Sequence, residues 1–472
     1  MSRKNNWFNI GWNKNTLVIF IFAVALILRF FLSLYNRQAN DNHVEVVSWI
    51  VDKRTLPVKE DCWECSQPKI YYLLNAAIMT AFHVNDPIQR IIAAQMFNFV
   101  LSAFFLVFAW LFIRNQNFSF RTKILAFSVV AFNPCLTGIN VQATNDTLEI
   151  LAGTMTIYFA DLFFKRWKTV HLIGMTLSVI LACITKGSGL SLLLGLLIVY
   201  SANFLIQPKQ KLKFLVISSA TFIVALMISV PFAGGYYDNY KKYNNPFINN
   251  ISQKDPPPEF FHETFTGRPG ITSIVHGYFT FRIVDMIQQP YINNDDTGYP
   301  LHRTSLWSQL YGRTFFLHFD QFPGTWASTD KKVLLVGKIL LVLGLVPLGI
   351  FLFGCYHACR DILRFIIKKN KSGMIENLSW MHFVFIVSCL LFIVKYTYDY
   401  RDFATMKSIF VFPVLLSVIS LFMHGFEKIK FRLLQNIFSV LVVCLVLISI
   451  IDILFLTNQL KDWAGKFELN KY

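Results

Sequence analysis

The chain contains 472 residues, of which 54% are hydrophobic and only 15% are charged, and its mean hydropathy is +0.47. A soluble protein does not need this many apolar residues to fill its core, so the excess must face lipid. Lys and Arg outnumber Asp and Glu by 44 to 27, which gives a net charge of +17. These cations are scattered between apolar runs and form no basic domain, which argues against nucleic-acid binding.

The first apolar run covers residues 16–35 and follows the basic residues Arg3, Lys4 and Lys14. This run is longer than the apolar region of a typical signal peptide and carries Arg29 near its end. No small-x-small cleavage pattern follows it. We therefore predict an uncleaved first membrane helix.

A helix needs about 20 mostly apolar residues to cross the roughly 30 Å hydrocarbon layer. Eleven apolar runs approach this length. They cover residues 16–35, 89–113, 124–142, 147–164, 170–185, 189–206, 214–233, 333–354, 378–395, 408–425 and 433–455. The sequence therefore predicts an all-α, multi-pass membrane protein with about 11 transmembrane helices, amphipathic helices on the outer face and a large outer loop.

Basic residues follow the second, fourth, sixth, eighth and tenth runs, and Lys and Arg near span ends remain on the cytoplasmic side. They are Arg114, Arg121, Lys123, Lys165, Arg166, Lys168, Lys209, Lys211, Lys213, Arg360, Arg364, Lys368, Lys369, Lys371, Lys428, Lys430 and Arg432. This alternation predicts a cytoplasmic N-terminus. It divides the chain into an N-terminal membrane module (1–233) with a first outer loop (36–88), a large outer loop (234–332) and C-terminal membrane helices (333–472).

Two stretches of the first outer loop are apolar but too short to span a membrane. Counting residues 70–83 as a span would reverse the sidedness of every later loop, so we predict a re-entrant or surface helix there. Residues 43–54 place Val44, Val47, Ile50 and Val51 on one helical stripe. This pattern predicts a second amphipathic helix lying on the membrane.

The first outer loop opens with the polar sequence Asn40-Asp41-Asn42-His43, followed by Glu45. A carboxylate at the membrane surface is well placed to act as general base on an acceptor hydroxyl while a lipid-linked donor lies alongside in the bilayer. The same residues also suit a helix N-terminus, with Asp41 or Asn42 as its cap. Both interpretations fit the sequence.

The motif CWECSQPKIYYLL contains Cys62 and Cys65, with Gln67, Pro68 and Lys69 directly after them. On the outer face such a pair can form a small disulfide, a redox pair or half of a metal site. No second cysteine pair and no histidine cluster stands nearby in the sequence to complete a zinc site, which favours the disulfide. Pro68 suits the first turn of the following helix.

Two further outer junctions carry charge. NDTLEI places Asn145, Asp146 and Glu149 between the third and fourth runs, either as a capping box or as groups that face the same cleft as Asp41. ITKGSGLS places Lys186 between the fifth and sixth runs. This cation could bind a lipid phosphate or extend to the lipid headgroups.

The last outer junction, YTYDYRDFATMKSIFVFP, contains Arg401 and Lys407, which the inside-positive pattern does not require there. Both side chains suit phosphate binding, and an ion pair with Asp399 or Asp402 is the alternative. The large outer loop contains the stiff proline segment DPPPEFF. It also adds candidates for ligand binding that show no metal-ligand spacing, namely His302, Arg303, Arg313, His318 and Asp320.

The order of these features resembles the GT-C glycosyltransferases, and within them the superfamily of protein O-mannosyltransferases and aminoarabinose transferases. The motifs are QPKIYYLL, NDTLEILAG, TKGSGL and RDFATMKSIFVFP, and the resemblance covers roughly the first 230 residues plus the last of these turns. It implies a GT-C-like fold and sugar transfer from a polyprenyl phosphate on the outer or luminal face. Asp41 matches the catalytic acid of the first loop. Gln67-Pro68-Lys69 stands where many relatives have His-Pro-Pro, so no metal ligand is assigned and a divalent metal stays an open question.

We therefore expect an inverting membrane glycosyltransferase in which Asp41 is the base and Lys186, Arg401 and Lys407 bind the donor phosphate. Accessory candidates are His43, Glu45, Gln67, Lys69, Asn145, Asp146 and Arg313. The expected partners are a polyprenyl-phosphate sugar, a lipid, glycan or protein acceptor, and membrane lipids. The alternatives are a transporter or flippase and a non-catalytic subunit that handles lipid-linked glycans. High usage of Phe, Lys and Asn indicates an AT-rich genome. For that reason we favour a bacterial plasma membrane over the endoplasmic reticulum.

Overall fold

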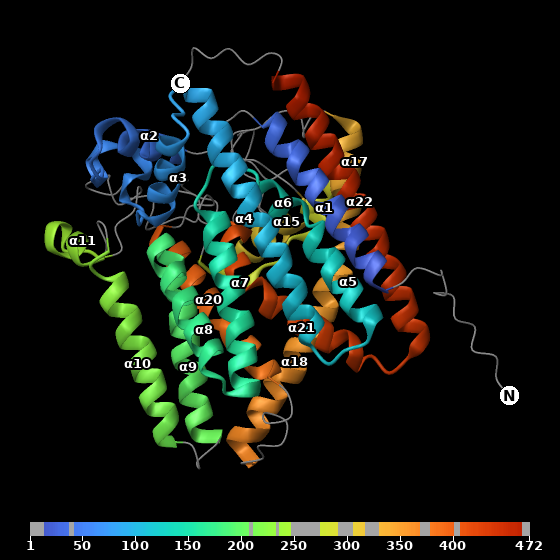
Figure 1. Ribbon diagram of the computed structural model, residues 1–472. Coiled ribbons are helices and arrows are strands. Elements are labelled where there is room, and N and C mark those ends of the chain that lie inside the picture. The colour runs from blue at the N-terminus through green and yellow to red at the C-terminus, as the bar shows by residue number, and fades with distance from the viewer. Residues whose placement is uncertain are drawn as a thin grey trace.

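The computed structural model describes residues 14–36, 42–206, 211–232, 236–246, 274–290, 305–316, 330–368, 378–400 and 406–464. All regular elements in these ranges are helices (Figure 1). The α-helices are α1 (Lys14–Tyr35), α2 (His43–Lys53), α3 (Ile70–Ala81), α4 (Pro87–Asn115), α5 (Phe120–Ala131), α6 (Pro134–Ile139), α7 (Asp146–Arg166), α8 (Thr169–Thr185), α9 (Leu190–Ile206), α10 (Lys211–Ser229), α11 (Tyr236–Tyr243), α13 (Ile274–Phe279), α14 (Ile283–Gln288), α15 (Leu306–Phe315), α17 (Lys331–Leu343), α18 (Leu345–Lys368), α20 (Ser379–Tyr400), α21 (Leu415–Lys428) and α22 (Arg432–Ala464). Short 3-10 turns are η1 (Lys59–Asp61), η2 (Trp63–Ser66), η3 (Gly187–Gly189), η8 (Ser408–Phe410) and η9 (Phe412–Val414).

Eight helical stretches in the described ranges are long and apolar enough to cross a membrane. They are Lys14–Tyr35, Pro87–Asn115, Asp146–Arg166, Gly187–Ile206, Lys331–Ile367, Ser379–Tyr398, Ser408–Lys428 and Arg432–Lys461. Three shorter apolar helices accompany them, at Ile70–Ala81, Thr169–Thr185 and Leu215–Ser229. The chain is therefore a multi-pass, all-α membrane protein, as the sequence predicts, while the predicted number of 11 spans stays a prediction.

The third predicted span, 124–142, is wrong as a single helix. α5 ends at Ala131, and α6 begins with Asn133 as its side-chain cap and Pro134 in its first turn. Proline cannot continue a helix, because it lacks an N–H and its ring clashes with the preceding turn. The carbonyl oxygen left over at Ala131 accepts a hydrogen bond of 2.8 Å from Arg29. The fully buried arginine of the first membrane helix thus satisfies a backbone group that lipid could not.

Two predicted spans in the C-terminal part have other boundaries than expected. The run predicted over 333–354 continues as α17 and α18, a 37-residue apolar stretch from Lys331 to Ile367. The run predicted over 408–425 begins with the 3-10 turns η8 and η9, and its α-helix starts only at Leu415. Pro413 lies in η9 and has no N–H for an α-helical hydrogen bond, which explains the irregular start.

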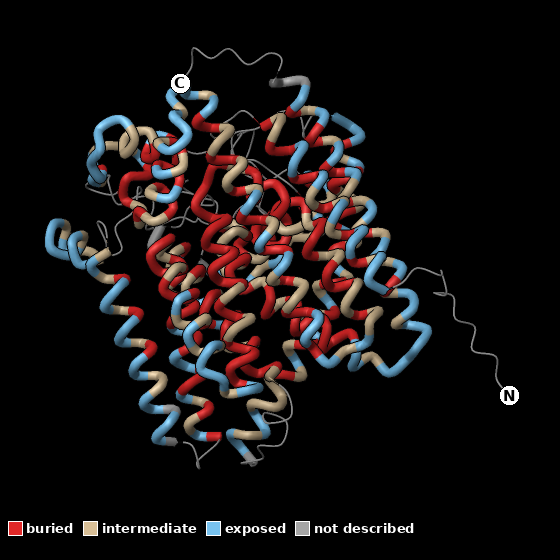
Figure 2. The backbone as a smooth tube through the Cα atoms, in the orientation of Figure 1, coloured by how far each residue is buried: buried red, intermediate tan, exposed pale blue. Residues whose placement is uncertain are grey.

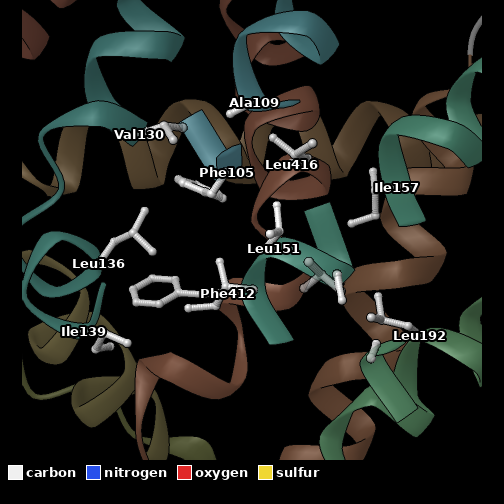
Figure 3. Packing of buried hydrophobic residues seen from close by; sticks show 14 of the residues in the cluster. Phe105, Ala109, Val130, Leu136, Ile139, Leu151, Ile157, Leu192, Phe412 and Leu416 are labelled. Atoms are coloured by element: carbon white, nitrogen blue, oxygen red, sulfur yellow. The ribbon is translucent and has the colours of Figure 1, made fainter. Parts of the chain in front are cut away.

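The main hydrophobic core joins helices from both ends of the sequence. Figure 3 shows Phe412 of η9 among side chains of the N-terminal half, including Leu136 of α6 and Leu151 of α7. All three are buried or nearly so. Figure 2 shows that burial is concentrated in the middle of the bundle, whereas α10 exposes much of its surface at the periphery. The turn at 408–414 is therefore a central element of the fold.

The helices α2 and α3 lie together at one end of the bundle, which we call the outer end (Figure 1). α3 has 12 residues, too few to cross a membrane, as predicted for 70–83. The predicted apolar stripe of α2 is only partly correct. Val44 and Val47 are buried, but so is Val46, and α2 packs on α3 and α4. This helix buries its apolar side chains against protein.

The opposite, inner end collects the basic ends of several helices. The Glu427 carboxylate of α21 accepts hydrogen bonds from the Ser119 backbone at 3.0 Å and the Thr122 hydroxyl at 2.6 Å, both near the start of α5. Arg121 donates to Asn436 of α22 at 2.7 Å. Figure 1 shows that α7, α9 and α18, each followed by basic residues, also end on the side of the bundle away from α2 and α3.

Candidate active site

A buried ion pair marks the outer end of the bundle. The Lys186 ammonium, at the C-terminus of α8, lies 2.5 Å from the Asp146 carboxylate in the first turn of α7. The two side chains retain only 13% and 9% exposure. Sequence analysis predicted that both residues lie at the outer face, and the structure joins them directly. Lys186 therefore does not extend freely to lipid headgroups.

The TKGSGL motif forms the turn that holds this lysine. Gly189 of η3 packs so closely on the last turn of α8 that an added Cβ would collide with the Ala182 backbone. A residue with a side chain would push η3 away from α8. The neighbouring Ser188 hydroxyl donates to Glu149 of α7 at 2.5 Å. The turn thus connects the starts of α7 and α9 around Lys186.

The capping-box interpretation of Asp146 and Glu149 is wrong. The N-cap residue of α7 is Asn145, and its side chain makes no capping hydrogen bond. The Asn145 amide donates to the Thr185 carbonyl at 3.3 Å instead. Both carboxylates point to α8 and η3. Glu149 is 1% exposed, and its second oxygen has no hydrogen-bond partner among the described residues.

A chain of hydrogen bonds connects α2 to this ion pair. His43 is buried, with Nδ1 2.8 Å from the Tyr72 hydroxyl and Nε2 3.2 Å from the Thr144 hydroxyl. The Thr144 hydroxyl donates to Asp146 at 2.6 Å. Because its single proton is used there, Thr144 can only accept from His43. His43 therefore donates from Nε2 to Thr144, and its Nδ1 lies within hydrogen-bonding distance of the Tyr72 hydroxyl.

Sequence analysis did not identify Tyr72, Thr144 and Asn98 as site residues. Asn98 is fully buried in α4, and its amide donates to the carbonyl oxygens of Gln142 and, at 2.7 Å, Thr144. These bonds hold the irregular segment that precedes α7. An asparagine in the middle of an apolar run is a recognisable sign of a polar contact inside the membrane, so Asn98 could have been found.

The turn at 408–414 approaches the same region from the C-terminal half. η9 packs on α7 at Gly153, where an added Cβ would collide with the Pro413 backbone. The Phe410 ring of η8 then lies 5.3 Å from the Lys186 ammonium. Lys407 is the N-cap residue of η8. The 3-10 turn η8 is thus capped by one predicted phosphate ligand, Lys407, and contacts a second, Lys186, through the Phe410 ring.

Arg313 reaches this turn through its backbone. The Arg313 carbonyl accepts a hydrogen bond of 3.0 Å from Ser408 in η8, and the Arg313 side chain donates to Gln309 at 3.0 Å. The side chain is 5% exposed. Arg313 is therefore buried in the protein interior, although this residue belongs to the predicted outer loop.

Three other accessory candidates are Glu45, Gln67 and Lys69. Glu45 is exposed on the first turn of α2. Lys69 is buried and donates to the carbonyl oxygens of Cys65 and, at 2.9 Å, Gln67. Gln67 thus binds Lys69 through its backbone carbonyl oxygen and not through its side chain. Cys62 and Cys65 form a disulfide, in agreement with the sequence-based preference.

Two lysines of the outer end have shifted acidities. Burial lowers the pKa of Lys69 to about 8, and the Glu64 and Asp61 carboxylates oppose this shift. Burial would also lower the pKa of Lys186, but the carboxylates of Asp146 and Glu149 outweigh it and raise the pKa above its usual range. The surroundings of Lys186 therefore favour its charged form, whereas burial favours the neutral form of Lys69.

The described residues do not form a metal-binding cluster. No three His, Cys, Asp or Glu side chains within the described ranges lie close enough to hold a metal ion together. A groove of about 530 Å³ between α2 and α3 is lined mainly by apolar side chains, such as Ile50, Leu73 and Ala77, with Arg54 among them. None of the predicted site residues lines this groove.

Several predicted residues lie outside the described ranges. These are Asp41 and Arg401, together with Asp402 and, in the large outer loop, the segment DPPPEFF, His302, Arg303, His318 and Asp320. Their assignments stay predictions from the sequence.

Comparison with known proteins identifies the fold. No family model matches the chain, and no curated protein matches its sequence. Among solved structures, the chain is similar to the apo oligosaccharyltransferase of Archaeoglobus fulgidus, with a TM-score of 0.50 and 12% identity over 98% of this chain and 57% of that one. It is also similar to the oligosaccharyltransferase AglB of Archaeoglobus fulgidus in complex with an inhibitory peptide and a dolichol-phosphate, with a TM-score of 0.51 and 12% identity over 95% and 56% of the two chains.

A third similar structure is ArnT from Cupriavidus metallidurans bound to undecaprenyl phosphate, with a TM-score of 0.40 and 13% identity over 86% of this chain and 77% of that one. The chain spans somewhat more than half the length of the two archaeal chains, 57% and 56%. The archaeal structures confirm the GT-C-like fold that the sequence resemblance implies.

Proposed function

We propose that this protein is an inverting membrane glycosyltransferase that takes a sugar from a polyprenyl phosphate at the outer end of the bundle. The observation that carries the proposal is the buried pair of Lys186 and Asp146, joined by hydrogen bonds to His43 of α2 and by a ring contact to η8. The pair brings together three motifs of the sequence resemblance. The archaeal neighbours, by name oligosaccharyltransferases, support sugar transfer on this fold, and one of them was solved with a dolichol-phosphate.

In this proposal Asp41 is the general base. It precedes His43 by two residues in the chain, and His43 is anchored at the site through Tyr72 and Thr144. Asp41 takes the proton of the acceptor hydroxyl while the acceptor oxygen attacks the anomeric carbon. The bond from that carbon to the phosphate oxygen breaks, and the polyprenyl phosphate leaves with the electron pair. One displacement inverts the anomeric configuration.

The leaving phosphate gains negative charge and needs fixed cations. The ammonium of Lys186 has three N–H donors, and Asp146 holds it in place. Since the pair itself is neutral, the net positive charge must come from other residues. Lys407 at the start of η8, and Arg401 six residues earlier in the chain, supply it in this proposal.

The inside-positive rule assigns the sidedness of the site. Cations collect at the inner end, so this end faces the cytoplasm, and the site then faces the extracytoplasmic or luminal side. The donor would reach the site from the bilayer and the acceptor from the outer solution. The proposed acceptor is a lipid, a glycan or a protein, and the transfer assay distinguishes these three classes.

The test is sugar transfer by the purified full chain in liposomes that contain polyprenyl-phosphate sugars with a radioactive sugar, with lipid, glycan and protein fractions as acceptors. Asp41→Asn should reduce transfer at least about 100-fold. The matched control is Asp238→Asn, which changes an exposed carboxylate of α11 in the predicted outer loop and should leave transfer unchanged. Full transfer by Asp41→Asn would disprove the base assignment, and no transfer by the wild type with any donor would favour a non-catalytic subunit or a transporter.

A further inference from the structure

At the inner end, α18 and α21 come into backbone contact and then frame a polar cluster. The contact is made by two glycines, because a Cβ on Gly354 would collide with the Leu421 carbonyl and one on Gly425 with the Ile350 carbonyl. Both helices run toward the inner end. His357 and Arg360 follow Gly354 on α18, and His424 and Lys428 flank Gly425 on α21. We call His357, Arg360, His424 and Lys428 the inner-end cluster.

The cluster contains buried nitrogen atoms without hydrogen-bond partners. Within the described part of the chain, His424 Nε2, both ring nitrogens of His357 and Arg360 Nε are buried and unpartnered. His424 is only 7% exposed, and the two imidazole rings lie 6.1 Å apart. A buried polar group without a partner costs free energy, so several such groups around one point indicate a missing hydrogen-bonding ligand.

The charge around the imidazoles indicates an anion. The charged groups that act on His357 are the cations Arg360, Lys428 and Arg364 and the carboxylate Asp361. His424 faces Lys428, Arg360 and Asp361, together with His357. Three cations against one carboxylate leave two positive charges. One guanidinium nitrogen of Arg360 lies 3.6 Å from a carboxylate oxygen of Asp361. Because a guanidinium has five N–H donors, Arg360 can also donate to another acceptor.

The cluster is bordered by apolar side chains that face outward. The Phe353 and Tyr356 rings lie 4.6 and 5.4 Å from the His357 ring and are 38% and 60% exposed. Leu352 and Leu363 on the same helix are about half exposed, at 54% and 49%. In a membrane protein such surfaces face acyl chains. The ligand therefore combines an anionic head with an apolar tail.

We propose that the inner-end cluster binds the phosphate headgroup of an anionic phospholipid from the leaflet at this end, with the acyl chains along the exposed face of α18. Arg360 and Lys428 pair with the phosphate charge, and the two histidines donate hydrogen bonds to its oxygens. The site is at the opposite end of the bundle from the ion pair of Lys186 and Asp146. The experiment that tests this site measures lipid binding. Its outcome therefore does not depend on whether the protein transfers a sugar.

The experiment titrates the purified full chain in a neutral detergent with short-chain phosphatidylglycerol or phosphatidylcholine and follows the thermal unfolding temperature. We expect a saturable rise with phosphatidylglycerol only. The double variant Arg360→Gln with Lys428→Gln should raise the half-saturating lipid concentration about 25-fold, since each cation near a headgroup contributes about fivefold. The matched control, Arg166→Gln with Lys168→Gln, removes two exposed cations at the same end and should bind like the wild type.

Three results would overturn the proposal. One is equal stabilisation by phosphatidylcholine, and another is wild-type affinity in the double variant of Arg360 and Lys428. The third is the same rise with inorganic phosphate alone at the same concentration, which would make free phosphate the ligand. If the double variant does not fold, Lys428→Gln alone takes its place, with an expected shift of about fivefold.

Discussion

Replacing Lys186 with glutamine removes the cation that faces Asp146 at 2.5 Å. Among the described residues, the carboxylate then keeps the Thr144 hydroxyl, at 2.6 Å, as its side-chain donor, in a site where it is 9% exposed. Breaking a buried ion pair from one side costs about 3 to 5 kcal/mol, because the remaining charge stays buried without its partner. We therefore expect Lys186→Gln to lose about 3 kcal/mol of unfolding free energy, and Asp146→Asn to lose a similar amount.

The double variant of Lys186→Gln with Asp146→Asn separates the pair from its surroundings. Two neutral amides can hydrogen-bond to each other, and neither leaves a buried charge. If the ion pair is a unit, the double variant loses about 3 kcal/mol or less, which is well below the sum of the single losses. Chemical unfolding of the four proteins in detergent gives these values. Additive single losses would show that the two side chains act independently and would refute the pair as the centre of the site.

Two further predictions concern the outer and inner ends. Lys69 has a pKa of about 8 in the folded state, compared with an ordinary value of 10.5. Between these two pH values the folded state binds fewer protons than the unfolded state. The free energy of unfolding should therefore rise with pH in this range, by at most about 1.4 kcal/mol for each pH unit. Unfolding measured at pH 7, 8, 9 and 10 should show this rise in the wild type and lose it in Lys69→Met; an equal rise in both proteins would assign it to another group. Gly354→Ala should destabilise the protein by about 1 to 3 kcal/mol, because the new Cβ collides with the Leu421 carbonyl, whereas Gly349→Ala on the same helix meets nothing within 4 Å. Thermal unfolding of both variants compares them, and equal stability would contradict the close contact of α18 and α21.

The membrane topology is largely encoded in local sequence. A segment that crosses lipid must satisfy its backbone hydrogen bonds within itself and must be apolar over about 20 residues, so hydropathy alone locates most spans. The boundaries were wrong where a single residue changes the backbone. Asn133 and Pro134 divide the third predicted span into α5 and α6, and Pro413 turns the start of another into 3-10 turns. The apolar side chains around these residues hide both breaks from a hydropathy scan.

The composition of the site was only partly accessible from sequence. Motifs at the outer junctions marked Asp146, Lys186 and His43, since charged and polar groups at span ends are conspicuous between apolar runs. Their connections were not predictable. Asp146 and Glu149 fit a capping box by spacing, but the tertiary structure places Lys186 and Ser188 within reach of them. A local pattern cannot show that a residue some 40 positions away competes for the same carboxylate.

The sequence by itself determined that this is an all-helical membrane protein with polar junctions at one end, because hydropathy and the distribution of Lys and Arg act through lipid and require no tertiary contact. Only the tertiary structure decided that Thr144 links His43 to Asp146, and that η8 brings Phe410 to Lys186. The physical reason is that these contacts depend on the close approach of helices at Gly153 and Gly189, where the packing of the whole bundle sets the distance between distant parts of the chain.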